Sequence, residues 1–114
     1  MKREIIDYLQ DIYTSILDLE EFVAGMEEEH FITDKKTVYA SVKCFEVMGE
    51  AVTKIPASFR KRYPRIPWQT IAGMQNKLVH EYFGVDKSVL WKTIKEDIPG
   101  LKPLMEQVIQ ENPA

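Results

Sequence analysis

Two long stretches of this chain repeat their apolar residues at the spacing of an α-helix, so each has one apolar face that must be buried. The first stripe consists of Ile5, Leu9, Ile12, Ile16, Leu19 and Val23, and Tyr8, Tyr13 and Phe22 widen it. The second consists of Val38, Val42, Phe45, Met48, Val52 and Ile55. Because neither stripe can be satisfied in water, the pattern predicts two amphipathic helices that pack against each other.

The residues around these stripes predict where the two helices end. The first helix, of about 22 residues, should stop at Gly25 and the acidic run Glu27–Glu29. Thr33 or Asp34 can cap the second helix by accepting a hydrogen bond from a free backbone N–H. This helix should run from about Asp34 to Ile55 and stop at the proline that follows.

The second half of the chain predicts shorter helices. A connector from Pro56 to Pro67 contains three prolines, two aromatic rings and a basic cluster. A third helix should run from Pro67 to Tyr82 and end at Gly84, which tolerates a left-handed conformation. Its apolar contacts are expected from Trp68, Ile71, Met74 and Leu78.

Asp86 should cap a fourth helix, whose apolar side chains are Leu90, Trp91 and Ile94. Pro99-Gly100 should then break or kink the chain before a short fifth helix, Leu101–Val108. There is no internal repeat, no low-complexity tract and no convincing strand. The sequence therefore predicts an all-α, antiparallel bundle of four to five helices, and its 114 residues suit a single domain over residues 1–114.

The composition predicts where the protein is located and excludes an internal disulfide. No apolar run approaches the roughly 20 residues that span a bilayer, and the amino terminus lacks the order of a signal peptide. A cytoplasmic location is expected. The only cysteine, Cys44, cannot form an internal disulfide, and its place in the second helix is typical of a buried small hydrophobe.

The charge distribution leaves two interpretations open for the connector. A net charge of −3 argues against binding nucleic acid through the overall field of the chain. The basic cluster Arg60, Lys61, Arg62 and Arg65 could nevertheless contact a phosphate backbone. It could equally be a solvated loop between two helices.

A polar stripe on the second helix also allows two interpretations. Tyr39, Lys43, Glu46 and Glu50 gather opposite the apolar face at 100° per residue. They could form a solvated face with local ion pairs, or they could line a cleft or contact a partner subunit.

The segment from Met74 to Asp86 carries the candidate chemistry. His80 can accept or donate a proton near neutral pH, although a histidine near a helix end can also simply interact with the helix dipole. Tyr82 could likewise be a packing residue. The two histidines lack metal-ligand spacing and no glycine-rich phosphate loop occurs, so neither a metal site nor a nucleotide cofactor is expected.

This segment resembles the signature of HEPN-domain proteins of the HepT type, in which an arginine is followed after four to six residues by histidine, any residue and tyrosine. His80-Glu81-Tyr82 fits its second half, and Asn76 occupies a position where the family commonly has asparagine. Further stretches are similar to HepT sequences in the same order: Val47–Ala51, Tyr63–Trp68, Val85-Asp86 and Trp91. The resemblance thus covers nearly the whole chain.

The resemblance implies a homodimeric helical bundle whose two motifs meet at a shared cleft. It implies a metal-independent RNA endonuclease, the toxin of a type VII-like toxin–antitoxin pair, with a minimal nucleotidyltransferase as antitoxin. His80 would act in proton transfer as a ribose 2′-hydroxyl attacks the adjacent phosphate. Tyr82 would be the residue that the nucleotidyltransferase modifies with AMP, which adds charge and bulk to the cleft. The alternative is a catalytically silent helical dimer that serves as the binding partner and substrate of that enzyme.

The chain departs from the family pattern at the arginine, because Gln75 occupies that position. An amide cannot offset charge on the transition state, and losing one such contact typically costs about 100-fold to 1000-fold in rate. On an ideal helix, Gln75 and Tyr82 share a face while His80 points about 140° away from Gln75. Either the helix unwinds near His80 or two copies complete one another, and the second arrangement is the one predicted.

Overall fold

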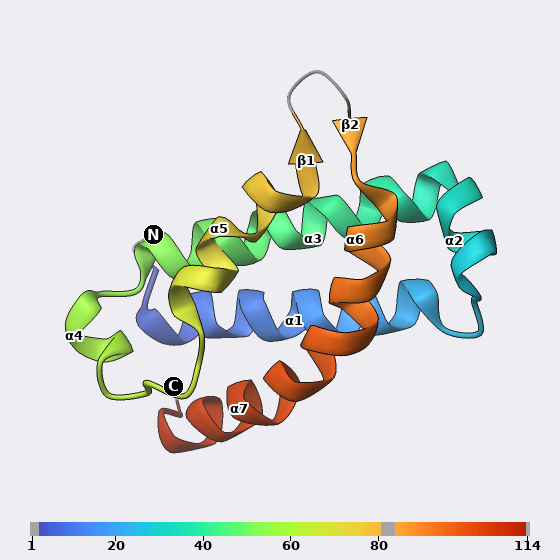
Figure 1. Cartoon of the computed structure of the whole chain (residues 1–114). Coiled ribbons are helices and arrows are strands. Elements are labelled where there is room, and N and C mark those ends of the chain that lie inside the picture. The colour runs from blue at the N-terminus through green and yellow to red at the C-terminus, as the bar shows by residue number, and fades with distance from the viewer. Residues whose placement is uncertain (1–2, 81–83, 114) are drawn as a thin grey trace.

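The structure is a computed structural model that describes residues 3–80 and 84–113, apart from the side chains of Gln75, Val79 and His80. The elements are α1 (Ile5–Val23), α2 (Glu28–Thr33), α3 (Lys35–Lys54), α4 (Ala57–Arg60), α5 (Trp68–Leu78), β1 (Val79–His80), β2 (Gly84–Val85), α6 (Lys87–Lys92), the π-helical turn η1 (Thr93–Asp97) and α7 (Ile98–Glu111). Figure 1 shows α1 between α3 and α7, each antiparallel to it. The predicted all-α antiparallel bundle is confirmed.

The two long helices follow the predicted apolar stripes. Every residue of the first stripe is buried except Ile5, and every residue of the second except Val42. Gly25 follows the end of α1 with a φ of 76°, the left-handed conformation that closes a helix at little cost for glycine. Asp34 caps α3, because its carboxylate accepts from the Thr37 backbone N–H at 3.3 Å.

The turn after α1 contains a helix that the sequence interpretation did not include. The acidic run was expected only to end α1, but Glu27 precedes α2, and Glu28 and Glu29 form its first turn. Acidic side chains are favourable there because the amino end of a helix carries partial positive charge. Phe31 of α2 is fully buried and stacks on Trp91 with ring centroids 5.2 Å apart, so this short helix closes one end of the core.

Helix α5 lies against α3 at a close backbone approach. A Cβ atom added to Gly49 of α3 would lie 3.3 Å from the Ala72 carbonyl oxygen of α5. At its other end, the Trp68 indole N–H lies 3.1 Å from the carbonyl oxygens of both Arg60 and Tyr63. The connector before it includes a short helix that the sequence did not specify, α4. Together these contacts fix where α5 begins and which way it runs.

The prediction that the third helix continues to Tyr82 was wrong. Helix α5 ends at Leu78, and the chain turns into an antiparallel pair in which Val79 pairs with Val85 and His80 with Gly84. The expectation of no strand was therefore also wrong for these two short segments. Gly84 does adopt the left-handed conformation, with a φ of 78°, but within β2 rather than at a helix end.

The last third of the chain is one helical run with an interruption. Asp86 caps α6, because its carboxylate accepts from the Val89 N–H at 3.1 Å. The predicted break near Pro99 lies one turn earlier, at η1, after which the chain changes direction (Figure 1). A wider turn is reasonable there because Pro99 has no N–H to donate. Helix α7 extends to Glu111 rather than ending at Val108.

One apolar core joins all of these helices. It includes the buried side chains of α1 and α3, those of α5 to α7, and single residues from the two short helices. Among the helices that the structure describes, none combines the length and the apolar composition needed to cross a bilayer.

Candidate functional site

The candidate catalytic segment lies where α5 ends and β1 begins. Gln75 and Asn76 belong to the last turn of α5, and His80 is the last residue of β1. The backbone N–H of Asp86 donates to the Leu78 carbonyl oxygen at 2.8 Å. The start of α6 is therefore tied directly to the end of α5, and Val79 and His80 of the intervening strand pair with Val85 and Gly84.

This geometry corrects the straight-helix interpretation of the motif. Gln75 and Tyr82 cannot share a helix face, because the helix stops four residues before Tyr82. Of the two arrangements considered, the unwinding of the helix before His80 is observed. Tyr82 lies outside the described residues, and only the backbone is described for Gln75 and His80. Asn76 is exposed.

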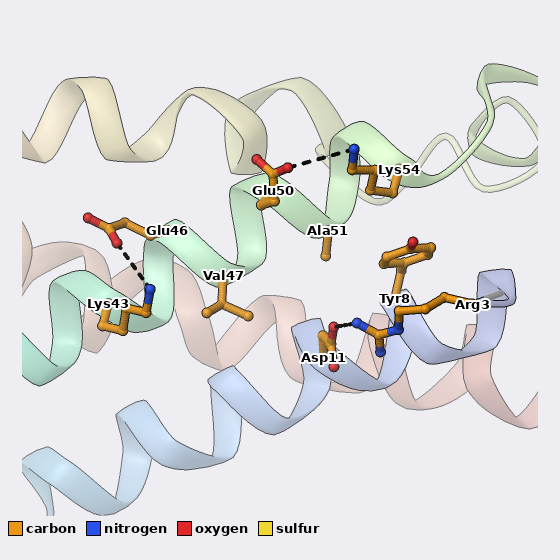
Figure 2. Close-up of a pocket in the computed structure, with 9 residues that line it drawn as sticks. All are labelled: Arg3, Tyr8, Asp11, Lys43, Glu46, Val47, Glu50, Ala51 and Lys54. Atoms are coloured by element: carbon orange, nitrogen blue, oxygen red, sulfur yellow. Dashed lines mark hydrogen bonds and ion pairs between the residues drawn. The ribbon is translucent and has the colours of Figure 1, made fainter. Parts of the chain in front are cut away.

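Three of the four residues of the predicted polar stripe on α3 line an open groove between α1 and α3, with a volume of about 480 Å³. Figure 2 shows Lys43, Glu46 and Glu50 on one wall and Arg3, Tyr8 and Asp11 on the other. The α1 residues were not foreseen, because a helical wheel describes one helix and not its neighbour. Tyr39, one turn before Lys43, is 60% exposed.

The charged groups of this groove are paired within the chain. Lys43 lies 3.6 Å from Glu46, and Lys54 lies 3.9 Å from Glu50. Arg3 donates to Asp11 at 2.7 Å (Figure 2), a hydrogen bond that raises the pKa of the guanidinium. The groove therefore contains the local ion pairs that one of the two interpretations of the stripe predicts.

Cys44 lies beside this groove and is 7% exposed. Burial raises the pKa of its thiol to about 11, since a thiolate loses its hydration inside the protein. The side chain thus behaves as the small hydrophobe that the sequence predicted. Among the described residues, no three His, Cys, Asp or Glu side chains gather in a way that could hold a metal ion.

Comparison with known proteins identifies the family. The HepT-like ribonuclease profile matches residues 12–108. The chain belongs to the HepT-like ribonuclease family. The resemblance seen in the segment around His80 and in the stretches on either side of it is thereby confirmed at the level of the family.

Relatives in several organisms match the chain over nearly its full length. It is 49% identical over 108 residues to a Thermococcus cleftensis protein named "Probable ribonuclease HepT", a match that covers 95% of this chain and 98% of the relative. It is 46% identical over 110 residues to a candidate RNase of Methanocaldococcus jannaschii, with 96% and 91% covered. A candidate RNase of Caldanaerobacter subterraneus is 39% identical over 104 residues, with 91% and 93% covered. No solved structure matches the chain.

Proposed function

We propose that this member of the HepT-like ribonuclease family is a metal-independent RNA endonuclease, the toxin of a type VII-like toxin–antitoxin pair that acts as a homodimer. The observation that carries the proposal is the His80-Glu81-Tyr82 motif in a chain whose family profile spans residues 12–108. The names of the relatives support a ribonuclease. The pairing of β1 with β2 supports it further, because a side chain carried by a paired strand is positioned more precisely than one on a loop.

His80 is assigned the proton transfer. As the ribose 2′-oxygen bonds to the adjacent phosphorus, the 2′-hydroxyl proton passes to an imidazole, and the bond from phosphorus to the 5′-oxygen breaks. The 5′-oxygen then takes up a proton, which leaves a 2′,3′-cyclic phosphate and a 5′-hydroxyl. An imidazole suits both transfers because it exchanges protons near neutral pH. Asn76, exposed at the end of α5, is assigned a hydrogen bond to the phosphate.

Gln75 is the reason to expect slow cleavage. A guanidinium at this position would offer a permanent positive charge and two parallel donors to the phosphate, whereas the glutamine amide is neutral and donates only through its single NH2 group. Removing one such electrostatic contact costs about 100-fold to 1000-fold in rate.

The test compares the natural chain with Gln75→Arg in buffer that contains EDTA, with single-stranded RNA labelled at its 5′ end. Gln75→Arg should raise the cleavage rate by about 100-fold or more. The matched control carries both Gln75→Arg and His80→Ala, and it should not cleave. Equal, negligible cleavage by Gln75→Arg and by this control would overturn the ribonuclease proposal.

Tyr82 is proposed as the site of control. A nucleotidyltransferase partner would transfer AMP from ATP to the phenol oxygen, with release of pyrophosphate and the phenol proton. The product carries a phosphodiester charge and an adenosine next to His80, so it would exclude RNA phosphate from the site. Incubation with a cognate nucleotidyltransferase, ATP and magnesium should add the mass of one AMP, and Tyr82→Phe should abolish the addition. Equal labelling of Tyr82→Phe would show that another residue is modified.

The alternative function is a catalytically silent dimer that binds and presents Tyr82 to the nucleotidyltransferase. Gln75 is the observation that favours it. This alternative predicts AMP addition together with no cleavage, even by Gln75→Arg. The two experiments above therefore separate the two functions.

The stripe of Tyr39, Lys43, Glu46 and Glu50 is assigned to the dimer face rather than to an RNA cleft. Its charges already have partners on their own helix, whereas an exposed tyrosine is a residue type enriched at protein interfaces. Tyr39→Glu should weaken the dimer, measured as the molar mass by light scattering across a dilution series. An unchanged dimer would assign the contact to another surface.

A further inference from the structure

The positive charges of this acidic chain are concentrated in one stretch. Residues 55–95 contain eight Lys or Arg and two Asp or Glu, a formal charge of +6, whereas the remaining residues contain seven and sixteen. The net charge of −3 thus conceals a strongly cationic segment inside an anionic chain. Such a segment attracts anions even when the whole chain does not.

This stretch contains the strand of His80 and the helices on either side of it in the sequence. It comprises α4, the connector, α5, the β1–β2 pair, α6 and the start of η1. In Figure 1, α4 and the connector lie at one end of α5, and the β1–β2 pair and α6 lie at its other end. The cationic side chains lie on both sides of β1 along the chain. We call the exposed ones the cationic surface: Lys61, Arg62, Arg65, Lys77, Lys87, Lys92 and Lys95.

The charges of the cationic surface have no acidic partners among the residues that the structure describes. Two of them lie over aromatic rings instead. The Arg62 guanidinium carbon is 5.5 Å from the centroid of the Phe59 ring, and the Lys95 ammonium nitrogen is 5.3 Å from that of Trp91. An unpaired, exposed cation can bind a phosphate without first giving up an ion pair.

The edge of the cationic surface is also defined. A hollow between α5 and α7 has Arg65 and Thr70 on one side and Glu96 and Asp97 on the other. These two carboxylates follow directly after Lys95 and would repel a phosphate backbone. A bound polyanion would therefore lie over α4, α5, the β1–β2 pair and α6, and would contact Arg65 without entering the hollow that this arginine lines together with Glu96 and Asp97.

We infer that single-stranded RNA binds along this cationic surface, held by the connector at one end of α5 and by α6 beside the β1–β2 pair at its other end. This inference rests on the proposed ribonuclease function, and it specifies how the substrate is held. Exposed cations with aromatic rings nearby are the usual means of binding single strands without sequence preference. An acidic protein partner is the competing occupant, and the experiment below tests against it.

The experiment measures the binding of fluorescein-labelled 2′-fluoro oligouridine to the full chain by fluorescence anisotropy at several salt concentrations. This RNA lacks the 2′-hydroxyl nucleophile, so binding is measured without cleavage. One variant neutralises the connector (Lys61→Gln with Arg65→Gln), and a second neutralises α6 (Lys87→Gln with Lys92→Gln). The control, Lys35→Gln with Lys36→Gln, removes the same charge from two exposed lysines at the start of α3.

The affinity falls as salt rises, and each lost phosphate contact should make the plot of log affinity against log salt less steep by about 0.7. If the variants bind equally at 1 M salt, this loss corresponds to about 5-fold weaker binding at 0.1 M salt. Each test pair should thus weaken binding by about 25-fold and reduce the slope by about 1.4, while the control binds like the natural chain. A control that loses as much as the test pairs would mean that net charge alone matters and would overturn the inference. So would a loss confined to one pair, or no measurable RNA binding by the natural chain.

The result is independent of the outcome for catalysis. If RNA binds through both pairs but Gln75→Arg does not cleave, the ribonuclease proposal fails and the binding surface stands. If Gln75→Arg cleaves and neither pair affects binding, the catalytic proposal stands and the binding surface is wrong.

Discussion

The groove between α1 and α3 and the cationic surface both contain lysine and arginine side chains. In the groove these cations are paired with carboxylates, and on the cationic surface they are not, within the part of the chain that the structure describes. In the groove, Lys43 and Lys54 each lie within 4 Å of a glutamate of the same helix. On the cationic surface, residues such as Arg65 and Lys77 have no acidic partner among the described residues. A phosphate gains little from a cation that is already paired, because the existing pair must first separate. The groove between α1 and α3 is therefore a poorer anion site than the cationic surface, although it is the more prominent hollow.

The two regions also differ in their backbone. The groove is formed by two long helices of 19 and 20 residues, whereas the cationic surface is carried by short helices, a connector and a pair of two-residue strands. Gly49 lies where these two regions meet, because α3 approaches the Ala72 carbonyl oxygen of α5 there. This contact holds α3 against the helix that leads directly into the His80 strand.

Of the substitutions that test this difference between the two regions, Gly49→Val is expected to have the largest effect on the free energy of unfolding. Its Cβ would lie 3.3 Å from the Ala72 carbonyl oxygen, and the added methyl groups have to push α5 away. Overpacking of this kind costs about 1 to 3 kcal/mol in the free energy of unfolding, measured by urea denaturation followed by circular dichroism. Gly73→Ala is the control, because its Cβ meets nothing within 4 Å and should stabilise α5 by about 0.5 to 1 kcal/mol. Equal effects of the two variants would show that α5 does not depend on this contact.

A smaller effect is expected from removing the lysines of the groove. Lys43→Gln with Lys54→Gln breaks two ion pairs whose side chains are mostly exposed, so the free energy of unfolding should fall by about 0.5 kcal/mol or less per pair. The affinity for 2′-fluoro oligouridine should stay within about twofold of the natural chain, since no phosphate contact is lost. A loss as large as that of the Lys61 and Arg65 pair would contradict the distinction between paired and unpaired cations.

The smallest effect concerns the cap of α3 and is confined to acid. Hydrogen bonds from the Thr37 backbone N–H and hydroxyl hold the pKa of Asp34 below its ordinary value of 3.8. The stabilisation by the carboxylate is therefore complete above pH 3.8 and is lost as the pH falls through the lowered pKa. Asp34→Asn retains a cap that does not titrate, so the difference in unfolding free energy between the two chains should shrink below about pH 4. A difference that stays constant down to about pH 2 would show that the charge of Asp34 does not stabilise α3.

Much of the fold could be predicted from the sequence because its causes are local. The apolar stripes defined α1 and α3, since helical periodicity depends only on residues a few positions apart. The two caps, Asp34 and Asp86, were found for the same reason. Helix α2 was missed because the glutamates that begin it also suit the end of α1, and its stability depends on burying Phe31 against Trp91.

The candidate site was predicted in identity but not in geometry. The residues His80, Gln75 and Asn76 and the family were visible in the sequence, and the profile match confirmed the family. The end of α5 at Leu78 was not visible, because the segment from Lys77 to Tyr82 has no residue that stops a helix. Pairing with Gly84 and Val85, and the hydrogen bond from Asp86 to Leu78, end the helix there. These partners lie several residues further along the chain, and helical propensity, which depends on neighbouring residue types, does not detect them.

The sequence by itself therefore determined the helical scaffold, the family and the total charge, because each depends on residue types and short spacings. Only the tertiary structure decided that His80 lies on a strand and that Arg3, Tyr8 and Asp11 face the polar stripe of α3 across one groove. It also decided that the cations of residues 55–95 have no acidic partners among the described residues. These properties depend on which groups meet in space, which residue types and short spacings do not determine.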